Sequence, residues 1–211
     1  MFLTILNHPV EGPGSIKEVL EERGFKVLER LATEIKGNET FDGLIVMGGP
    51  MGVYESDRYP YLNVEMTLIR RAITSGKPVL GVCLGSQLIS AALGGSVSRG
   101  EFGEELGVYK VYLLEDLRDV LGPSIEVFQM HGDTFTLPKG GKLLAYSEKY
   151  FQAFRVGTAL GLQFHLEVNR KIVSQWIEYY KINRQFDREV DDERLRRSSE
   201  KVISYWLSSV S

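Results

Sequence analysis

Hydrophobic positions in the first half of the chain fall into short apolar runs separated by stretches of helical periodicity. The runs have the length and composition of buried strands, and they lie at Phe2–Leu6, Phe25–Leu28, Gly43–Met47 and Val79–Val82. Helices are predicted between them, from Ser15 to Gly24, at Tyr61–Ser75 and at Leu84–Leu93. Strands that alternate with helices are typical of βαβ units and a parallel sheet.

Polar residues and glycines mark the ends of the predicted helices. Ser15 is an N-cap candidate, and Glu18 three residues later fits a capping box. Gly24 and Gly76 lie where the first and second helices should end.

The pattern changes after Gly94-Gly95, because the strands are no longer separated by helices. Apolar runs with short turns between them lie at Val97, Val108–Leu114, Ile125–Met130, Lys142–Ser147, Ala153–Val156 and Ala159–Phe164. Part of this half is therefore predicted to be antiparallel. From Asn169 the chain turns helical, with apolar stripes at Ile172, Val173, Trp176, Ile177 and Tyr180 and, after the charged stretch Asp187–Arg197, at Val202, Ile203, Trp206 and Leu207.

These elements predict an α/β fold of the doubly wound type. Its central sheet should be mostly parallel and flanked by helices, with some antiparallel strands in the second half and helices at the C-terminus. A length of 211 residues suits one domain, 1–211, in which 170–211 form the helical C-terminal part.

Composition narrows the function classes. The net charge is −3 and no basic run with interleaved aromatic residues occurs, so nucleic acid is not a predicted partner. No apolar run approaches membrane-spanning length, and the N-terminus lacks the pattern of a signal peptide. A single cysteine cannot form an internal disulfide. We therefore expect a cytoplasmic protein without membrane association.

That cysteine, Cys83, lies at a predicted strand-to-helix junction with Gly81 and Gly85 two residues to either side. Glycines at this spacing permit a sharp turn that exposes a nucleophile, and a helix N-terminus favours the thiolate. An inert buried cysteine is the alternative. The paired glycines favour catalysis.

A cysteine nucleophile needs a base, and the base needs an orienting group. His165 follows an apolar strand, and Glu167 would share its face if the chain stays extended. A surface His–Glu pair is the plainer alternative. His131, with Asp133 two residues on, is the rival base, but Gly132 suggests a turn, and a pocket wall suits His131 better.

A glycine-rich turn, Gly48–Gly52, follows another strand at the same sheet edge. Its exposed N–H groups suit an oxyanion, whereas a phosphate loop would need a Gly-Lys-Ser/Thr ending that is absent. No Cys/His cluster has zinc spacing, so neither a metal nor another cofactor is predicted.

The loop His8–Gly14 follows the first strand, and Glu11 or His8 should line the cleft entrance unless the loop is only a structural turn.

Together these segments resemble the class I, or triad, glutamine amidotransferases. The matching segments, in family order, are Gly48–Pro50, Gly81–Leu88, His131–Asp133 and Gly161–Val168. Details at His131–Phe135 and Gln152–Arg155 are similar to a stand-alone branch that resembles the glutamine amidotransferase domain of GMP synthase.

The resemblance implies a role for each part of the site. Cys83 would attack the side-chain amide of glutamine, His165 would carry the proton, and Glu167 would orient His165. The N–H groups of Gly49 and Leu84 would form the oxyanion hole.

Gln87 and the turn at Met130 and His131 would bind the backbone end of glutamine, and water would then release the γ-glutamyl thioester.

Two departures from the family pattern stand out. Leu166 replaces the usual proline between the histidine and the glutamate, which puts their geometry in doubt. These 211 residues contain no ATP-binding loop of a synthetase domain, so we expect a synthetase subunit in trans to accept the ammonia. The alternatives are a γ-glutamyl peptidase or hydrolase with the same triad and a non-catalytic binding or redox-sensing protein.

Overall fold

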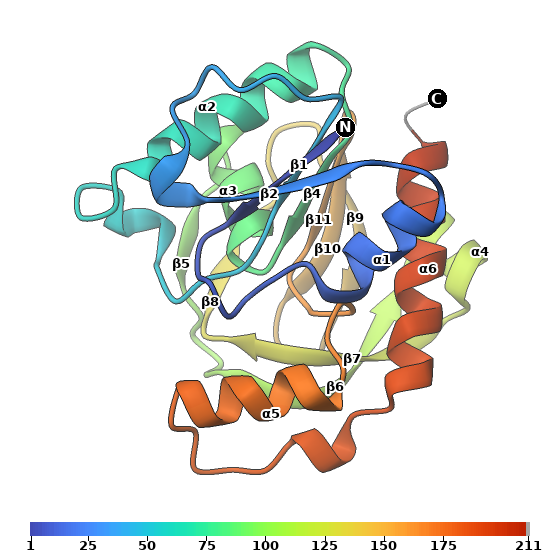
Figure 1. Ribbon diagram of the computed structural model, residues 1–211. Coiled ribbons are helices and arrows are strands. Elements are labelled where there is room, and N and C mark those ends of the chain that lie inside the picture. Colours follow the sequence, from blue (N-terminus) through green and yellow to red (C-terminus); the bar gives the residue numbers. More distant parts are fainter. Residues whose placement is uncertain (210–211) are drawn as a thin grey trace.

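Within residues 1–209, which the computed structural model describes, the strands form a nine-stranded sheet and a two-stranded one (Figure 1). The predicted domain 1–211 ends two residues outside this range. The strands are β1 Phe2–Leu6, β2 Val27–Leu31, β3 Gly43–Val46, β4 Val79–Val82, β5 Val97–Arg99, β6 Glu105–Leu113, β7 Ser124–His131, β8 Asp133–Phe135, β9 Lys142–Tyr146, β10 Phe151–Val156 and β11 Ala159–Leu162.

The large sheet has the order β2-β1-β3-β4-β11-β10-β9-β6-β7. Its first five strands pair in parallel, and the remaining four pair antiparallel. The predicted fold class is confirmed. Because β4 and β11 are parallel neighbours, the segments that follow Val82 and Leu162 leave the sheet at the same edge.

Helices cover both faces of the sheet. Figure 1 shows α2 and α3 on one side and α1 and α6 on the other, while α5 crosses the end of the sheet toward which β1 runs. The helices are α1 Gly14–Glu22, α2 Tyr61–Thr74, α3 Leu84–Ala92, α4 Glu115–Leu121, α5 Arg170–Tyr179 and α6 Asp192–Ser208, with 3₁₀ turns η1 Ala32–Glu34, η2 Val53–Glu55 and η3 Asp187–Glu189. None of the helices within residues 1–209 is long and apolar enough to cross a membrane.

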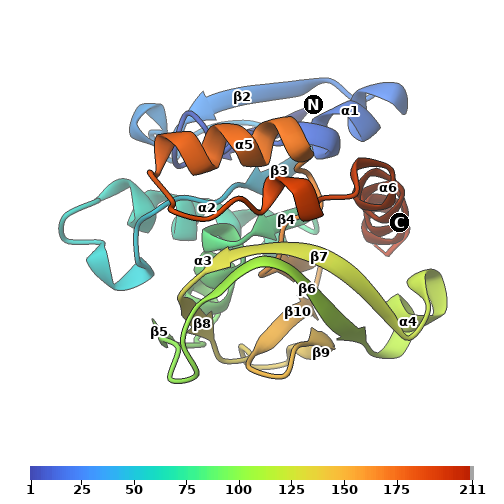
Figure 2. The same ribbon diagram turned by 90° about the horizontal axis from the view of Figure 1, so that it is seen from below.

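The C-terminal helix packs onto the chain's own sheet. The aromatic rings of Trp206 and Phe2 lie 5.7 Å apart between centroids, and Val202, Ile203 and Trp206 are buried. Figure 2 shows α6 beside α1 and the curved β6–β7 ribbon on the opposite side of the molecule from β2.

Two sequence predictions about local structure were wrong. Ser15 does not cap α1, which begins at Gly14; its hydroxyl instead bonds the carbonyl of Leu166 at 3.3 Å and the hydroxyl of Ser199 at 2.9 Å. The second strand occupies Val27–Leu31 rather than Phe25–Leu28, because the N–H of Phe25 bonds Leu20 and closes the end of α1.

Candidate active site

Cys83 lies between the end of β4 and the start of α3, with a backbone φ of +52° and ψ of −111°. A positive φ is strained for a residue with a side chain, and it makes the turn sharp. A Cβ atom on Gly81 would overlap the carbonyl of Gly85, and one on Gly85 would overlap the carbonyl of Val46. The close backbone packing expected from the two glycines is therefore confirmed.

The Cys83 sulfur faces polar groups from three segments of the chain. Sγ lies 3.8 Å from the carbonyl oxygen of Met130, and Nε2 of Gln163 donates to it at 3.7 Å. Within residues 1–209, the N–H groups of Gly49 and Leu84 donate no hydrogen bond. A Cβ on Gly49 would lie 3.3 Å from a methyl group of Leu84. Two unused backbone donors therefore lie beside the nucleophile elbow.

His165 is buried and forms a short hydrogen bond with Glu167, 2.6 Å from Nδ1 to Oε1. Nε2 is also buried and makes no hydrogen bond in the described part of the chain. Burial disfavours charge on the ring, but the attraction of Glu167 and of the nearby Cys83 sulfur outweighs it and raises the pKa of His165 well above the ordinary value. A free ring nitrogen thus remains near the sulfur.

The sequence suggested that His165 lies directly at the end of a strand, but it does not. β11 ends at Leu162, and His165 forms an isolated antiparallel bridge with Phe128 of β7. The carbonyl of Leu166 accepts a bond from Ser15, and the carbonyl of Glu167 accepts the N–H of Ser15 at 3.0 Å. These anchors hold the His–Glu geometry without the proline of the family pattern.

His131 is the last residue of β7 and not part of a turn, which corrects the sequence prediction. Its Nδ1 faces the carbonyl of Asp133 at 2.8 Å and its Nε2 faces Glu105 at 2.8 Å, so both ring nitrogens are occupied. Burial opposes the charge on Glu105, but hydrogen bonds from His131, Ser147 and Gln152 outweigh it and lower the pKa of Glu105. The imidazole of His131 is therefore held in a fixed position in the wall of the site.

Gln87, the predicted substrate-binding residue of α3, also has internal partners. Its Nε2 donates to the carbonyl of Asp133 at 3.3 Å and to Oε1 of Gln163 at 3.1 Å. Only its carbonyl oxygen therefore has capacity for a ligand.

The loop His8–Gly14 divides into a part that reaches the cavity and a part that does not. Tyr180 donates from its hydroxyl to Oε1 of the buried Glu11 at 2.5 Å. Burial raises the pKa of Glu11, even though the bond from Tyr180 opposes the shift. His8 instead bonds Tyr179 at 3.1 Å and lines neither of the two cavities that reach Cys83. The predicted position at the cleft thus holds for Glu11 alone.

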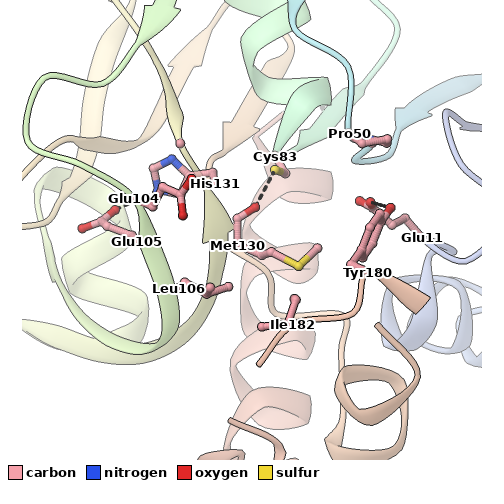
Figure 3. Close-up of a pocket in the computed structure, with 12 residues that line it drawn as sticks. Glu11, Pro50, Cys83, Glu104, Glu105, Leu106, Met130, His131, Tyr180 and Ile182 are labelled. Atoms are coloured by element: carbon pink, nitrogen blue, oxygen red, sulfur yellow. Dashed lines mark hydrogen bonds and ion pairs between the residues drawn. The ribbon is translucent and has the colours of Figure 1, made fainter. Parts of the chain in front are cut away.

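Cys83 opens into a cavity of about 280 Å³. Figure 3 shows the sulfur at its upper end, with Met130 on one side and the Glu11–Tyr180 pair on the other. A second cavity of about 360 Å³ also reaches Cys83, and its lining includes Arg99, Gln87 and Asp133. Within residues 1–209, no three His, Cys, Asp or Glu residues are grouped as ligands for a metal ion.

Sequence reasoning missed several residues around Cys83. Glu105 and Tyr180 pair with groups that are 26 and 169 positions away in the chain, so no local spacing reveals them. Arg99 lines the second cavity from a three-residue strand without a periodic pattern. Gln163 offered a signal, because it precedes His165 by two residues in an otherwise apolar segment.

Comparisons with known proteins agree with this geometry. A glutamine-hydrolysing GMP synthase of Pyrobaculum aerophilum is 36% identical over 135 residues, which are 62% of this chain and 25% of the relative. Gamma-glutamyl peptidase 5 of Arabidopsis thaliana is 27% identical over 164 residues, 73% of this chain and 64% of the relative. The chain thus spans about a quarter of the first relative and under two thirds of the second.

Similarity in structure extends over the whole fold. The crystal structure of a glutamine amidotransferase from Thermotoga maritima superposes with a TM-score of 0.82 and 34% identity, and the match covers 99% of this chain and 95% of the other. The model of the class-I glutamine amidotransferase family matches residues 14–176, most of the chain. This protein belongs to the class-I glutamine amidotransferase family.

Proposed function

We propose that this protein hydrolyses the side-chain amide of glutamine or a γ-glutamyl compound through a thioester on Cys83. The observation that carries the proposal is the arrangement of Cys83 at a strained elbow beside His165, whose far nitrogen is held by Glu167 at 2.6 Å. Such a constellation activates a nucleophile and orients its base.

In the first step, the Cys83 sulfur attacks the amide carbon and the carbonyl oxygen becomes an oxyanion. The unused N–H groups of Gly49 and Leu84 would stabilise that charge. His165 gives the leaving nitrogen a proton as the C–N bond breaks. Water then attacks the thioester, passes a proton to His165 and releases glutamate as the C–S bond breaks.

The second cavity suits the amino-acid end of the substrate. The carbonyl oxygen of Gln87 can accept from an α-ammonium group, and the guanidinium of Arg99, which also pairs with Glu104 at 3.3 Å, can bind an α-carboxylate. Met130 would contribute through its carbonyl beside the sulfur. His131 would stabilise this wall and not bind the substrate through its ring, since both of its ring nitrogens are bound.

Two destinations for the leaving nitrogen follow from the relatives. In the first, ammonia from glutamine passes to a synthetase subunit on a separate polypeptide, in a reducing compartment such as the cytoplasm that keeps Cys83 free. In the second, which the likeness to a gamma-glutamyl peptidase favours, an amine or peptide leaves instead. Both use the same thioester.

The direct test is covalent labelling of the nucleophile. A glutamine analogue that alkylates the nucleophile should label Cys83 in the protein, detected by peptide mass spectrometry, and glutamine should protect the site. Cys83→Ser should lose both labelling and amide hydrolysis. Normal turnover by Cys83→Ala would overturn the proposal.

For the partner, ammonia release from glutamine would be compared with and without a candidate synthetase subunit. Stimulation on mixing supports transfer in trans, and an unchanged rate over a range of subunit concentrations argues against that subunit as the partner.

A further inference from the structure

The space around Cys83 consists of two lobes with different linings. The apolar lobe, the cavity of about 280 Å³, is bordered by Glu11, Leu106, Met130, Tyr180 and Ile182. The polar lobe, about 360 Å³, shares the wall around Cys83 and Met130 with the apolar lobe and adds groups that include Arg99, Gln87 and Asp133. Either volume far exceeds the ~30 Å³ that a water-sized molecule takes up in the liquid. Ammonia alone would leave most of a lobe unused.

The position of His165 indicates which lobe receives the leaving group. A Cβ atom on Gly48 would lie 3.4 Å from Cβ of Cys83 and 3.6 Å from Cε1 of His165, and it would overlap Oε2 of Glu11. Glu11, which borders only the apolar lobe, therefore lies on the same side of the sulfur as the base. A nitrogen that takes its proton from His165 departs toward Glu11 and Tyr180.

The lining of the apolar lobe is unsuited to a carboxylate. No lysine or arginine belongs to the lining among the described residues. The imidazole of His131, which belongs to the lining, has both nitrogens bound, to the carbonyl of Asp133 and to Glu105. A carboxylate on the leaving group would be stripped of water beside the carboxylate of Glu105, with no cation in the described lining to pair with it.

Three residues of the lining of the apolar lobe come from the two ends of the chain. Glu11, Tyr180 and Ile182 all lie outside residues 14–176, the part that matches the family model. After α5, Lys181 adopts a φ of +53°, and the N–H of Ile182 bonds the carbonyl of Ile177 at 3.0 Å. This turn fixes the positions of Tyr180 and Ile182, the residues on either side of Lys181. The side of the lobe that these three residues form thus lies outside the segment that matches the family model.

We propose that the preferred substrates are γ-glutamyl amides of primary amines that carry an apolar group and no carboxylate. The proposal rests on the thioester chemistry proposed above for Cys83. Acylation breaks the bond between the γ-carbon and the substituted nitrogen, and the amine leaves through the apolar lobe with a proton from His165. Water then cleaves the thioester, so that the products are glutamate and the free amine.

A matched pair of substrates isolates the carboxylate. γ-Glutamylleucine and γ-glutamylisoamylamide differ only in the α-carboxylate of the leaving group, and glutamine serves as the unsubstituted reference. Steady-state release of glutamate by the wild-type protein gives kcat/KM for each. We expect the isoamylamide to exceed both γ-glutamylleucine and glutamine by at least about tenfold, as apolar contacts and an unpaired buried charge typically discriminate.

Two variants test the lobe itself. Ile182→Arg places a cation in the lining and should raise kcat/KM for γ-glutamylleucine while lowering it for the isoamylamide. Tyr179→Phe is the matched control, because Tyr179 is exposed, lies outside the lobe and loses only its bond to His8. It should leave the ratio of the two substrates unchanged.

The outcomes separate the two proposals. Turnover of glutamine at a rate equal to or above that of the isoamylamide, with Cys83 acylated, overturns the inference about the leaving group and leaves the thioester chemistry in place. Equal turnover of γ-glutamylleucine and the isoamylamide overturns it as well. Absence of any turnover and of any acylation of Cys83 overturns the proposed function, and the inference with it.

Discussion

Each of two buried histidines is paired with a glutamate, and the pairs differ in what the second ring nitrogen meets. The Nδ1 atom of His165 bonds Glu167 and its Nε2 has no partner within residues 1–209. The ring of His131 is bound at both nitrogens, by Glu105 and by the carbonyl of Asp133. A base needs a free nitrogen, so only the first pair has the arrangement of a catalytic dyad.

Replacing the two histidines should therefore give different defects. His165→Ala should lower the rate of Cys83 acylation by about 10²–10⁴-fold, the usual contribution of a general base. His131→Ala should reduce that rate less but lower the unfolding free energy by about 3–5 kcal/mol, because the buried Glu105 loses its ion-pair partner and keeps only the bonds from Ser147 and Gln152. Stopped-flow acylation and urea denaturation measure the two effects. The opposite ranking of the acylation rates would make His131 the base.

Glu65 is a further buried carboxyl group, on α2 beneath the oxyanion loop. It accepts a bond at 3.1 Å from Asn7, which also donates to the carbonyl of Met47 at 3.2 Å. Burial raises the pKa of Glu65 to about 8. The ordinary pKa of this carboxyl group is 4.5. Between pH 4.5 and about pH 8, the unfolded chain therefore releases the proton while the folded chain retains it. Glu65 thus makes the fold less stable as the pH rises through this range.

Glu65→Gln removes that titration and keeps an acceptor for Asn7. The stability of the variant relative to wild type should rise from about pH 5 to about pH 8, by up to about 1.4 kcal/mol for each unit of pKa shift. Urea denaturation at both pH values measures it. Glu193→Gln, whose side chain is 90% exposed, is the control and should show no such trend. A flat difference for Glu65→Gln would show that Glu65 is ionised in the folded state.

At the scale of single residues, the sequence was most informative where the chemistry is local. Cys83 and the pair His165–Glu167 depend on spacings of two residues, which can be read along the chain. Glu105 and Tyr180 acquire their roles through partners that only the folded sheet brings close. Whether His131 has a ring nitrogen free for a ligand likewise depends on its hydrogen-bond partners in the folded protein, which its sequence neighbours do not reveal.

At the scale of elements, buried strands with a continuous apolar run were predictable. Very short strands and helices without an apolar stripe were not. Val79–Val82 is a fully buried strand with a continuous apolar run, and its predicted bounds are confirmed. The helix Glu115–Leu121 was missed because only Leu117 is buried, so it has no stripe. β8 was missed since three residues are too few to show alternation.

The turn from β4 into α3 depends on the absence of side chains. In Gly85→Ala, the added methyl group would overlap the carbonyl of Val46, a backbone atom that cannot rotate away. We expect a loss of about 1–3 kcal/mol in unfolding free energy, as for other overpacked sites, and slower alkylation of Cys83. Gly12→Ala is the control, because its Cβ would meet nothing within 4 Å. Equal behaviour of both variants would contradict this account of the elbow.

At the scale of the whole molecule, the C-terminal helix belongs to the core. The apolar stripe predicted near the end of the chain packs onto its own domain, since Val202, Ile203 and Trp206 of α6 are buried against the sheet. Between α5 and α6, the chain passes the apolar lobe at Tyr180 and Ile182. The end of the chain thus both covers one face and shapes the site.

Trp206→Ala should destabilise the protein by about 3–5 kcal/mol, the usual cost of removing a buried tryptophan. Phe102→Ala, at a site where the ring is 67% exposed, should change stability far less. Urea denaturation followed by far-ultraviolet circular dichroism measures both. A loss for Trp206→Ala no larger than that for Phe102→Ala would mean that α6 is not part of the cooperative unit.

The bridge between His165 and Phe128 joins the base to the outermost strand of the sheet. The N–H of His165 bonds the carbonyl of Phe128 at 2.8 Å, and the N–H of Phe128 returns a bond at 3.2 Å. Because β7 also carries Met130 and His131 and ends the strand order, displacement of this edge moves base and cavity wall together. A shift of β7 would therefore change the position of His165 relative to Cys83 without any contact inside the cavity.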